Sequence, residues 1–176
     1  MSIRAIVEGL AGADVAFVIV GMAAGQLHGS RLLTEDVDLV YKDDTENIAK
    51  MATYLKSIDA SIIDLWPNEG GFEIEPASQF SADTLSREKR VTLRTREGEI
   101  DLLHRIDGVG GYDEVLATSQ RFNVGTLTPR VISLDGLIAS KQAAGRPKDR
   151  LHLPDLECLR EIKRQGIRSP KPPNLG

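Results

Sequence analysis

Two short apolar runs, separated by a segment that begins at a glycine, limit most strongly what this chain can fold into. The run VAFVIVG (15–21) is rich in β-forming residues and stops at Gly21, and the run DVDLVY (36–41) follows after a short spacer. Residues i and i+2 of a strand point to the same face, so Asp36 and Asp38 project together while the apolar residues between them face the other way. The sequence therefore predicts a sheet strand with one buried face and one acidic face.

The rest of the sequence alternates between helical and strand patterns. Apolar spacing and capping residues predict helices at 2–11 (with Ser2 as N-cap), 22–28 (ended by Gly29), 43–58, 111–119 and 133–145 (capped by Ser133, closed by Gly145). Other runs predict strands at 60–66 and within 121–134, a hairpin at 90–106 and a turn at 67–71. Residues 147–166 predict a second helical stretch, interrupted near Pro154. We expect an α+β (α/β) fold, a small mixed sheet flanked by helices with a C-terminal helical hairpin.

Length and composition indicate one globular domain. The 176 residues are 41% hydrophobic and 27% charged, which is enough to build a core and unlike a disordered chain. We assign residues 1–168 to a single domain and residues 169–176, which hold three prolines, to a flexible tail. A net charge of -4 gives no general attraction to nucleic acid or to an anionic membrane.

Neither a membrane nor a secretory pattern is present in the sequence. The apolar stretch 15–24 is too short to span a bilayer and is preceded by Glu8 and Asp14, which a signal peptide would avoid. We therefore expect a cytoplasmic protein without membrane association. Cys158 is the single cysteine, which excludes an intrachain disulfide and a multi-cysteine zinc site, and we expect it to be a small buried apolar residue.

The paired acids are the first candidate site. Adjacent carboxylates raise each other's pKa unless a cation lies between them, and such oxygen ligands suit Mg²⁺. A bare Asp-x-Asp motif is more often a solvated strand end than a metal site. Gly21 by itself is most simply an ordinary strand-to-helix turn, but the start of a helix at this position would also favour binding of phosphate. Asp101, in GEIDLLH, would complete a two-metal site. Alternatively, Asp101 and Glu99 line the open face of the hairpin.

A basic segment follows in the C-terminal helices. Lys141 lies seven residues after Leu134 on the core-facing side of its helix, so its side chain either extends out to solvent or meets an anion. The segment GRPKDR (145–150) adds cations around Asp149, or it is a solvated turn, which is the interpretation we prefer for Arg150.

Several familiar motifs are missing. The sequence has no GxxxxGK[ST] phosphate loop, and GVGGY does not match the dinucleotide-binding GxGxxG pattern. His28, His104 and His152 show no metal-ligand spacing, and we interpret each as a structural or surface histidine.

In combination, these residues resemble the DNA polymerase beta-like nucleotidyltransferase superfamily in its minimal, stand-alone bacterial form. The family pattern is hydrophobic-Gly-Gly/Ser, a spacer of roughly nine to thirteen residues, Asp-hydrophobic-Asp/Glu-hydrophobic, and an acid on a later strand. Here Val20-Gly21-Met22, Asp36-Val37-Asp38-Leu39 and Asp101 fall on that pattern. A branch with R-x-T-x-D-h-D-L and S/A-K…G-R-x-K-D, which includes toxin–antitoxin and abortive-infection nucleotidyltransferases, is matched at Arg31, Thr34, Asp36, Asp38, Lys141, Arg146, Lys148 and Asp149.

The resemblance implies a Mg²⁺- or Mn²⁺-dependent enzyme that moves a nucleoside monophosphate from a nucleoside triphosphate, such as ATP, to a hydroxyl of a tRNA, a protein or a small molecule. It implies that Asp36 and Asp38 bind metal, and that Asp101 binds a second metal and helps to deprotonate the acceptor. The phosphates would be held by the amides of Gly21 and Met22 with Arg31 and Lys141, and less strongly by Ser30 and Thr34. Asp149 is expected to orient Arg146 or Lys141 rather than to bind metal.

One position departs from the family. Met22 stands where Gly or Ser is preferred, which keeps the backbone amide, removes a hydroxyl and adds a bulky side chain beside the phosphates. This supports a second hypothesis, a catalytically weak or inactive component of a toxin–antitoxin pair or a partner-binding module. A third is a small α/β domain with acids as surface decoration. Retention of all three acids favours the enzyme, because an inactive site has no reason to keep charges that repel.

Overall fold

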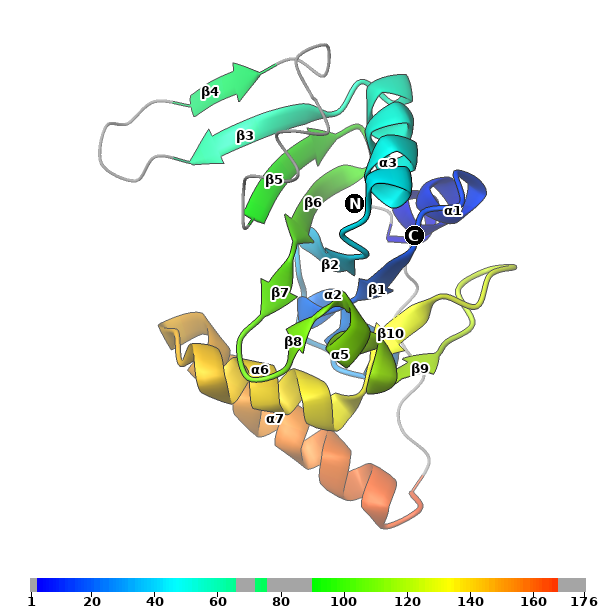
Figure 1. Cartoon of the computed structure of the whole chain (residues 1–176). Coiled ribbons are helices and arrows are strands. Elements are labelled where there is room, and N and C mark those ends of the chain that lie inside the picture. The colour runs from blue at the N-terminus through cyan, green and yellow to red at the C-terminus, as the bar shows by residue number, and fades with distance from the viewer. Residues whose placement is uncertain (1–2, 66–71, 76–89, 168–176) are drawn as a thin grey trace.

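A computed structural model of the chain describes residues 3–65, 72–75 and 90–167. In this part of the chain one mixed sheet runs in the order β4-β3-β5-β6-β2-β1-β10-β9 (Figure 1). Its strands are β1 (Phe17–Ile19), β2 (Asp36–Tyr41), β3 (Ser61–Leu65), β4 (Phe72–Glu75), β5 (Arg90–Thr95), β6 (Gly98–Leu103), β9 (Ser119–Arg121) and β10 (Arg130–Ile132). A small pair is formed by β7 (Arg105–Ile106) and β8 (Gly110–Gly111).

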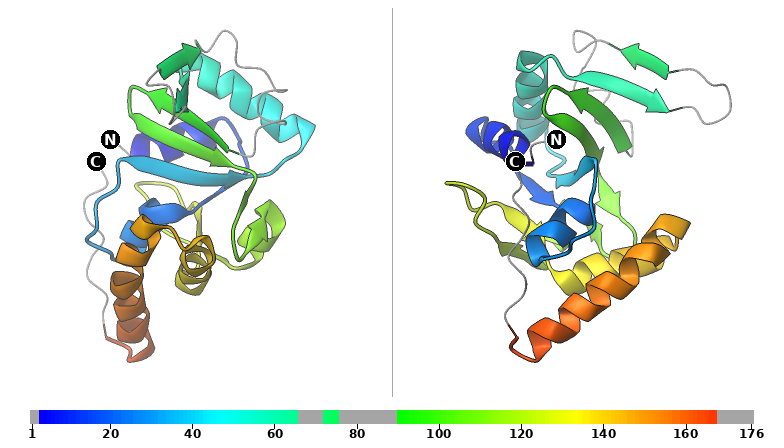
Figure 2. Two further views of the ribbon diagram at one scale, coloured as in Figure 1. Left: turned by 90° about the vertical axis from the view of Figure 1, so that its left-hand side faces the viewer. Right: turned by 180° about the vertical axis from the view of Figure 1, so that it is seen from behind.

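The helices gather in separate places around this sheet. They are α1 (Ile3–Gly12), α2 (Gly21–His28), α3 (Thr45–Ser57), α5 (Tyr112–Ala117), α6 (Leu134–Ala144) and α7 (Pro147–Arg164). Helices α1 and α3 pack side by side, whereas α6 and α7 form a hairpin at the end of the molecule opposite β3 and β4 (Figures 1 and 2). The expected architecture, a mixed sheet with flanking helices and a C-terminal helical hairpin, is confirmed.

The centre of the sheet places the acids. Strand β2 pairs antiparallel with β1 and parallel with β6, in a register that puts Asp38 opposite Asp101. The other face of β2 is core, since Val37, Leu39 and Tyr41 are each no more than 1% exposed. The predicted split of this strand into a buried face and an acidic face is therefore confirmed, and the parallel pairing brings in the third acid.

Local signals fixed the helix ends as expected. Gly29 ends α2 in the left-handed conformation (φ 110°), and Gly145 ends α6 in the same way (φ 60°). The Ser133 hydroxyl caps α6 by accepting a hydrogen bond from the Gly136 amide at 3.1 Å. Ser133 therefore sets where the helical hairpin begins, and Gly145 sets where it turns.

Two expectations were wrong. Helix α7 continues through Pro154 without interruption, because Pro154 lies on the exposed side, where the Arg150 carbonyl that loses its partner can face water, while Leu156 and Leu159 stay in the core. Cys158 is exposed rather than buried, since it falls between the core-facing positions of α7.

Other expectations cannot be compared with the described residues. The Ser2 cap, the turn at 67–71 and the tail at 169–176 lie outside them, and β4 falls partly in a stretch for which the sequence suggested no element. The single domain over 1–168 stays a prediction. Across the described helices, none has the length and apolarity needed to cross a bilayer.

Candidate active site

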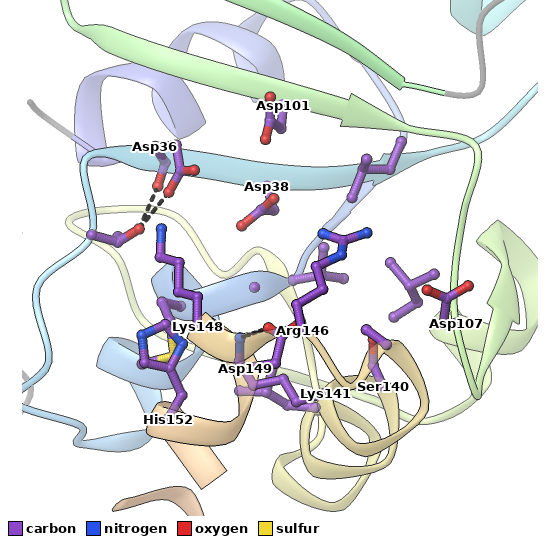
Figure 3. A pocket seen from close by; sticks show the side chains of 18 of the residues that line it. Asp36, Asp38, Asp101, Asp107, Ser140, Lys141, Arg146, Lys148, Asp149 and His152 are labelled. Atoms are coloured by element: carbon purple, nitrogen blue, oxygen red, sulfur yellow. Dashed lines mark hydrogen bonds and ion pairs between the residues drawn. The ribbon is translucent and has the colours of Figure 1, made fainter. Parts of the chain in front are cut away.

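Three carboxylates from two neighbouring strands form one cluster. Asp36 and Asp38 come from β2 and Asp101 from β6, and one oxygen of each lies within 4.8 Å of the others. Figure 3 shows them along one side of a pocket. Asp101 is the deepest, at 2% exposure. Three hard oxygen donors at this spacing are a donor set that Mg²⁺ or Mn²⁺ accepts.

Without a bound cation, repulsion among the three carboxylates raises the free energy of the cluster. Burial, followed by the charges of Asp36 and Asp101, raises the pKa of Asp38 from 3.8 to about 7. Arg90 and Lys141 offset part of this increase in pKa. A divalent ion would relieve the repulsion among the three acids, so the residues fit a metal on electrostatic grounds as well as by donor type.

Asp101 and Asp36 are held by hydrogen bonds within the sheet and the preceding loop. Arg90 Nη2 donates to Asp101 Oδ2 at 2.5 Å, and Thr92 Oγ1 donates to Asp101 Oδ1 at 2.7 Å. The Thr34 hydroxyl bonds Asp36 Oδ1. Thr34, expected as a weak phosphate contact, therefore lines the pocket as a partner of Asp36.

The start of α2 forms the next part of the pocket. The Asp38 carbonyl accepts from the Val20 amide at 2.9 Å, which brings the turn against β2. Gly21 has φ +60°, and a Cβ added there would overlap the Asp38 carboxylate, with Asp38 Cγ only 2.6 Å away. Only glycine allows this approach. Val20 provides no side-chain cap, so the first amides of α2 are available to an anion.

Met22 lies at the edge of the same pocket. Its side chain is 3% exposed and lies along its own helix, where a Cβ added to Gly25 would come within 2.8 Å of Met22 Cε. Met22 also belongs to the pocket lining. Its effect on nucleotide binding therefore stays a prediction.

Cations face the acids from the helical hairpin. Lys141 is 8% exposed, and its Nζ pairs with Asp149 Oδ1 at 2.9 Å, so of the two partners expected for Asp149, Arg146 or Lys141, the structure shows Lys141. Arg146 and Lys148 are exposed, and their side chains extend from the hairpin toward the sheet (Figure 3). Arg150 is exposed and bonds the Gly145 carbonyl, in agreement with the solvated-turn interpretation.

Together the strands and the hairpin enclose a pocket of about 530 Å³, within the usual range for small-molecule sites. We call β2 and β6 with their three acids the sheet wall, and the hairpin with Lys141, Arg146 and Lys148 the helix wall. The rest of the lining is mixed, with Leu103, Arg105, Ile106, Asp107, Leu137 and Ser140.

Two predicted phosphate contacts are not brought to this pocket. Ser30 is fully buried, donates to Asp155 Oδ2 at 2.5 Å and accepts from the Leu32 amide, so it braces the loop before β2. Arg31 is exposed and is not part of the pocket lining. Neither side chain lies in the pocket as expected, because the sequence pattern does not show which side of the loop each residue occupies.

Sequence reasoning missed several residues that line the pocket or hold its acids. Arg90 and Thr92 were not singled out, although their alternation on a predicted hairpin strand was a usable signal. His152 was interpreted as structural or surface, but it lines the pocket at 9% exposure, and its Nδ1 is buried without a hydrogen-bond partner among the described residues. His28 is structural as expected, with Nε2 donating to the Ile132 carbonyl at 2.7 Å.

Solved nucleotidyltransferases share this architecture. The lincosamide antibiotic adenylyltransferase LnuA, bound to lincomycin, matches with a TM-score of 0.56 and 13% identity over 88% of this chain and 93% of its own. An antigenic nucleotidyltransferase-like protein from Paracoccidioides brasiliensis matches with a TM-score of 0.55 and 19% identity over 91% and 74%, respectively. ANT(2'')-Ia in complex with adenylyl-2''-tobramycin matches with a TM-score of 0.52 and 12% identity over 93% and 97%.

These likenesses show that the chain has the nucleotidyltransferase fold. No protein-family model matches the chain, and no curated protein matches its sequence. The superfamily resemblance inferred from the motifs is therefore supported at the level of the fold, and the toxin–antitoxin branch stays a prediction.

Proposed function

We propose that the protein is a metal-dependent nucleotidyltransferase that moves a nucleoside monophosphate from a nucleoside triphosphate to a hydroxyl acceptor. The observation that carries this proposal is the acidic cluster of Asp36, Asp38 and Asp101 facing the cations of the helix wall across one pocket. Acids that bind metal and cations that bind phosphate are the two requirements of phosphoryl transfer, which depends on positioning and charge stabilisation.

Each wall has its own task in this proposal. Asp36, Asp38 and Asp101 would hold Mg²⁺ or Mn²⁺, which when bound supplies Lewis-acid stabilisation of charge on the phosphates. The amides of Gly21 and Met22 and the ammonium of Lys141 would bind the triphosphate, because free helix amides and a buried cation both favour anions.

The transfer step defines what the acids must do. The acceptor oxygen forms a bond to the α-phosphorus, the bond from that phosphorus to the bridging oxygen breaks, and pyrophosphate leaves with its electron pair. The acceptor's hydroxyl proton passes to a carboxylate, for which the family pattern indicates Asp101. Both oxygens of Asp101 accept hydrogen bonds from Arg90 and Thr92, so Asp101 is held in one orientation facing the cluster.

Among tRNA, protein and small-molecule acceptors, we favour a small molecule. LnuA is an antibiotic adenylyltransferase and ANT(2'')-Ia is an antibiotic-resistance factor seen with an adenylylated tobramycin. The alternative of an inactive toxin–antitoxin component was based on Met22. Met22 packs along α2 near Gly25 and also lines the pocket, so this alternative stays open to the test below.

Labelled-nucleotide transfer tests the proposal. The protein would be incubated with Mg²⁺ or Mn²⁺, each α-labelled triphosphate, and pools of small molecules, RNA and proteins as acceptors. We expect transfer that is lost in Asp36→Ala and Asp38→Ala and kept in Asp113→Ala, an exposed acid on α5. Absence of both transfer and triphosphate binding in the wild type would refute the enzyme.

A further inference from the structure

One ion pair joins the acidic cluster to the rim of the pocket. Arg90, the first residue of β5, forms an ion pair with Asp101 at 2.5 Å. The Asp101 side chain is only 3% exposed, whereas that of Arg90 is 50% exposed. A buried acid is thus bonded by an arginine that reaches it from the rim of the pocket.

Charge balance explains why an arginine lies there. The three carboxylates lie within 4.8 Å of one another, so each raises the free energy of the others' ionised forms. Lys141 also acts on the cluster, but its ammonium is already paired with Asp149. Of the ion pairs among the described residues, the one that reaches the cluster comes from Arg90.

The contact also occupies one side of the carboxylate that a metal would bind. Thr92 occupies Asp101 Oδ1 and Arg90 occupies Oδ2, so both oxygens of the deepest acid are engaged. The two partners differ in freedom. Thr92 lies between Val91 and Leu93, which are 4% and 0% exposed, whereas the half-exposed Arg90 side chain can turn toward solvent without disturbing the core.

We infer that Arg90 is a positioning residue that takes the place of a metal at Asp101 and is exchanged for the divalent ion when the ion binds. This inference rests on the proposed function. In the metal-free protein Arg90 keeps Asp101 pointed into the cluster, and Thr92 maintains that orientation after the exchange. The arrangement keeps the site assembled and lowers its affinity for free metal, because the ion has to displace a charge-assisted hydrogen bond.

Strand β5 provides a matched control. Arg94 lies four residues after Arg90 and pairs with Glu99 of β6 at 3.1 Å, with 53% of its side chain exposed. It carries the same charge on the same strand pair, but its partner Glu99 does not belong to the three-acid cluster. Arg90→Gln and Arg94→Gln therefore remove equal charge and differ in whether they free a cluster oxygen.

Mn²⁺ titration calorimetry at constant ionic strength, without nucleotide, tests the inference. We expect Arg90→Gln to bind Mn²⁺ about tenfold more tightly than the wild type, since a charged hydrogen bond no longer competes. Arg94→Gln should stay within about twofold of the wild type, as expected for an exposed pair. Without metal, Arg90→Gln should melt at a lower temperature, and Mn²⁺ should raise its Tm more than that of the wild type.

Unchanged or weakened Mn²⁺ affinity in Arg90→Gln, or an equal gain in Arg94→Gln, would overturn the inference. If Arg90→Gln does not fold, Arg90→Lys takes its place, because lysine keeps the charge without the guanidinium fork, and a smaller gain in affinity is expected. A wild type that binds no Mn²⁺ would instead contradict the proposed function, so the two failures can be told apart.

Discussion

The two walls of the pocket differ in how their charged side chains are stabilised. The sheet wall holds three acids on paired strands, and burial together with the neighbouring acids raises the pKa of Asp38 to about 7. The helix wall pairs its buried Lys141 with Asp149 and leaves Arg146 and Lys148 exposed to solvent. Repulsion among its acids therefore destabilises the sheet wall until a cation binds, whereas the buried cation of the helix wall already has an anionic partner. Sites of this kind trade stability for function.

The largest expected effect comes from removing one carboxylate charge from the sheet wall. Asp38→Asn should lower transfer by about 10³-fold or more, because a metal ligand is lost. The same change should raise the Tm of the metal-free protein at pH 8. The folded pKa of Asp38 lies above its usual value of 3.8, so its charge costs stability increasingly as pH rises from about 4 to 7. Assays and thermal melts check both signs, and a lower Tm would show that the sheet wall is not strained.

Gly21→Ala should be nearly as damaging. A methyl group at φ +60° would overlap the Asp38 carboxylate, so the acid must move away from α2. We expect transfer to fall by about 10²-fold and the Tm to fall by several degrees. Gly12→Ala is the control, because a Cβ there meets nothing within 4 Å. Retained activity in Gly21→Ala would show that the close approach of α2 is unnecessary.

The attachment of the helix wall should depend on pH. His28 on α2 bonds the Ile132 carbonyl just before α6, and its Nδ1 lies 2.9 Å from Lys163 Nζ of α7. Burial lowers the pKa of His28 from 6.5 to about 4. Protonation therefore favours the unfolded state, and stability present above pH 6.5 should be lost as pH falls toward 4, by about 3 kcal/mol.

Urea unfolding at several pH values measures this loss. The wild type should lose more stability between pH 6.5 and 4.5 than His28→Asn, which has no imidazole to protonate. Parallel curves for the two proteins would show that His28 is not responsible.

The smallest effect is expected from an exposed cation of the helix wall. Lys148 is exposed, and its side chain extends toward Asp36 (Figure 3). Lys148→Ala should raise the KM for the triphosphate about three- to tenfold, the loss of one partly exposed charge contact, with no change in Tm. Steady-state kinetics and a melt test this difference, and a fall in Tm would mean that Lys148 also supports the fold.

Local features of both walls could be predicted from the sequence. Asp36 and Asp38 follow from strand periodicity, and the ends of α2 and α6 follow from Gly29, Ser133 and Gly145. These are local signals, fixed by a few neighbouring residues.

Non-local choices could not be predicted in the same way. The ion pair of Arg90 with Asp101 depends on the register of two strands, and the position of Ser30 depends on Asp155, which lies 125 residues away. The inward turn of Met22 depends on a rotamer and on the space above Gly25. The continuity of α7 through Pro154 depended on which side of the helix is exposed.

The central claim is that the sheet wall binds a divalent cation, and the Mn²⁺-induced shift in Tm at pH 8 and pH 6 tests it most directly. Metal binding must displace the proton that Asp38 holds below its pKa of about 7. The account predicts a clear stabilisation at pH 8, a smaller one at pH 6, and almost none at either pH in Asp38→Asn. No stabilisation in the wild type, or the same stabilisation in Asp38→Asn, would contradict it.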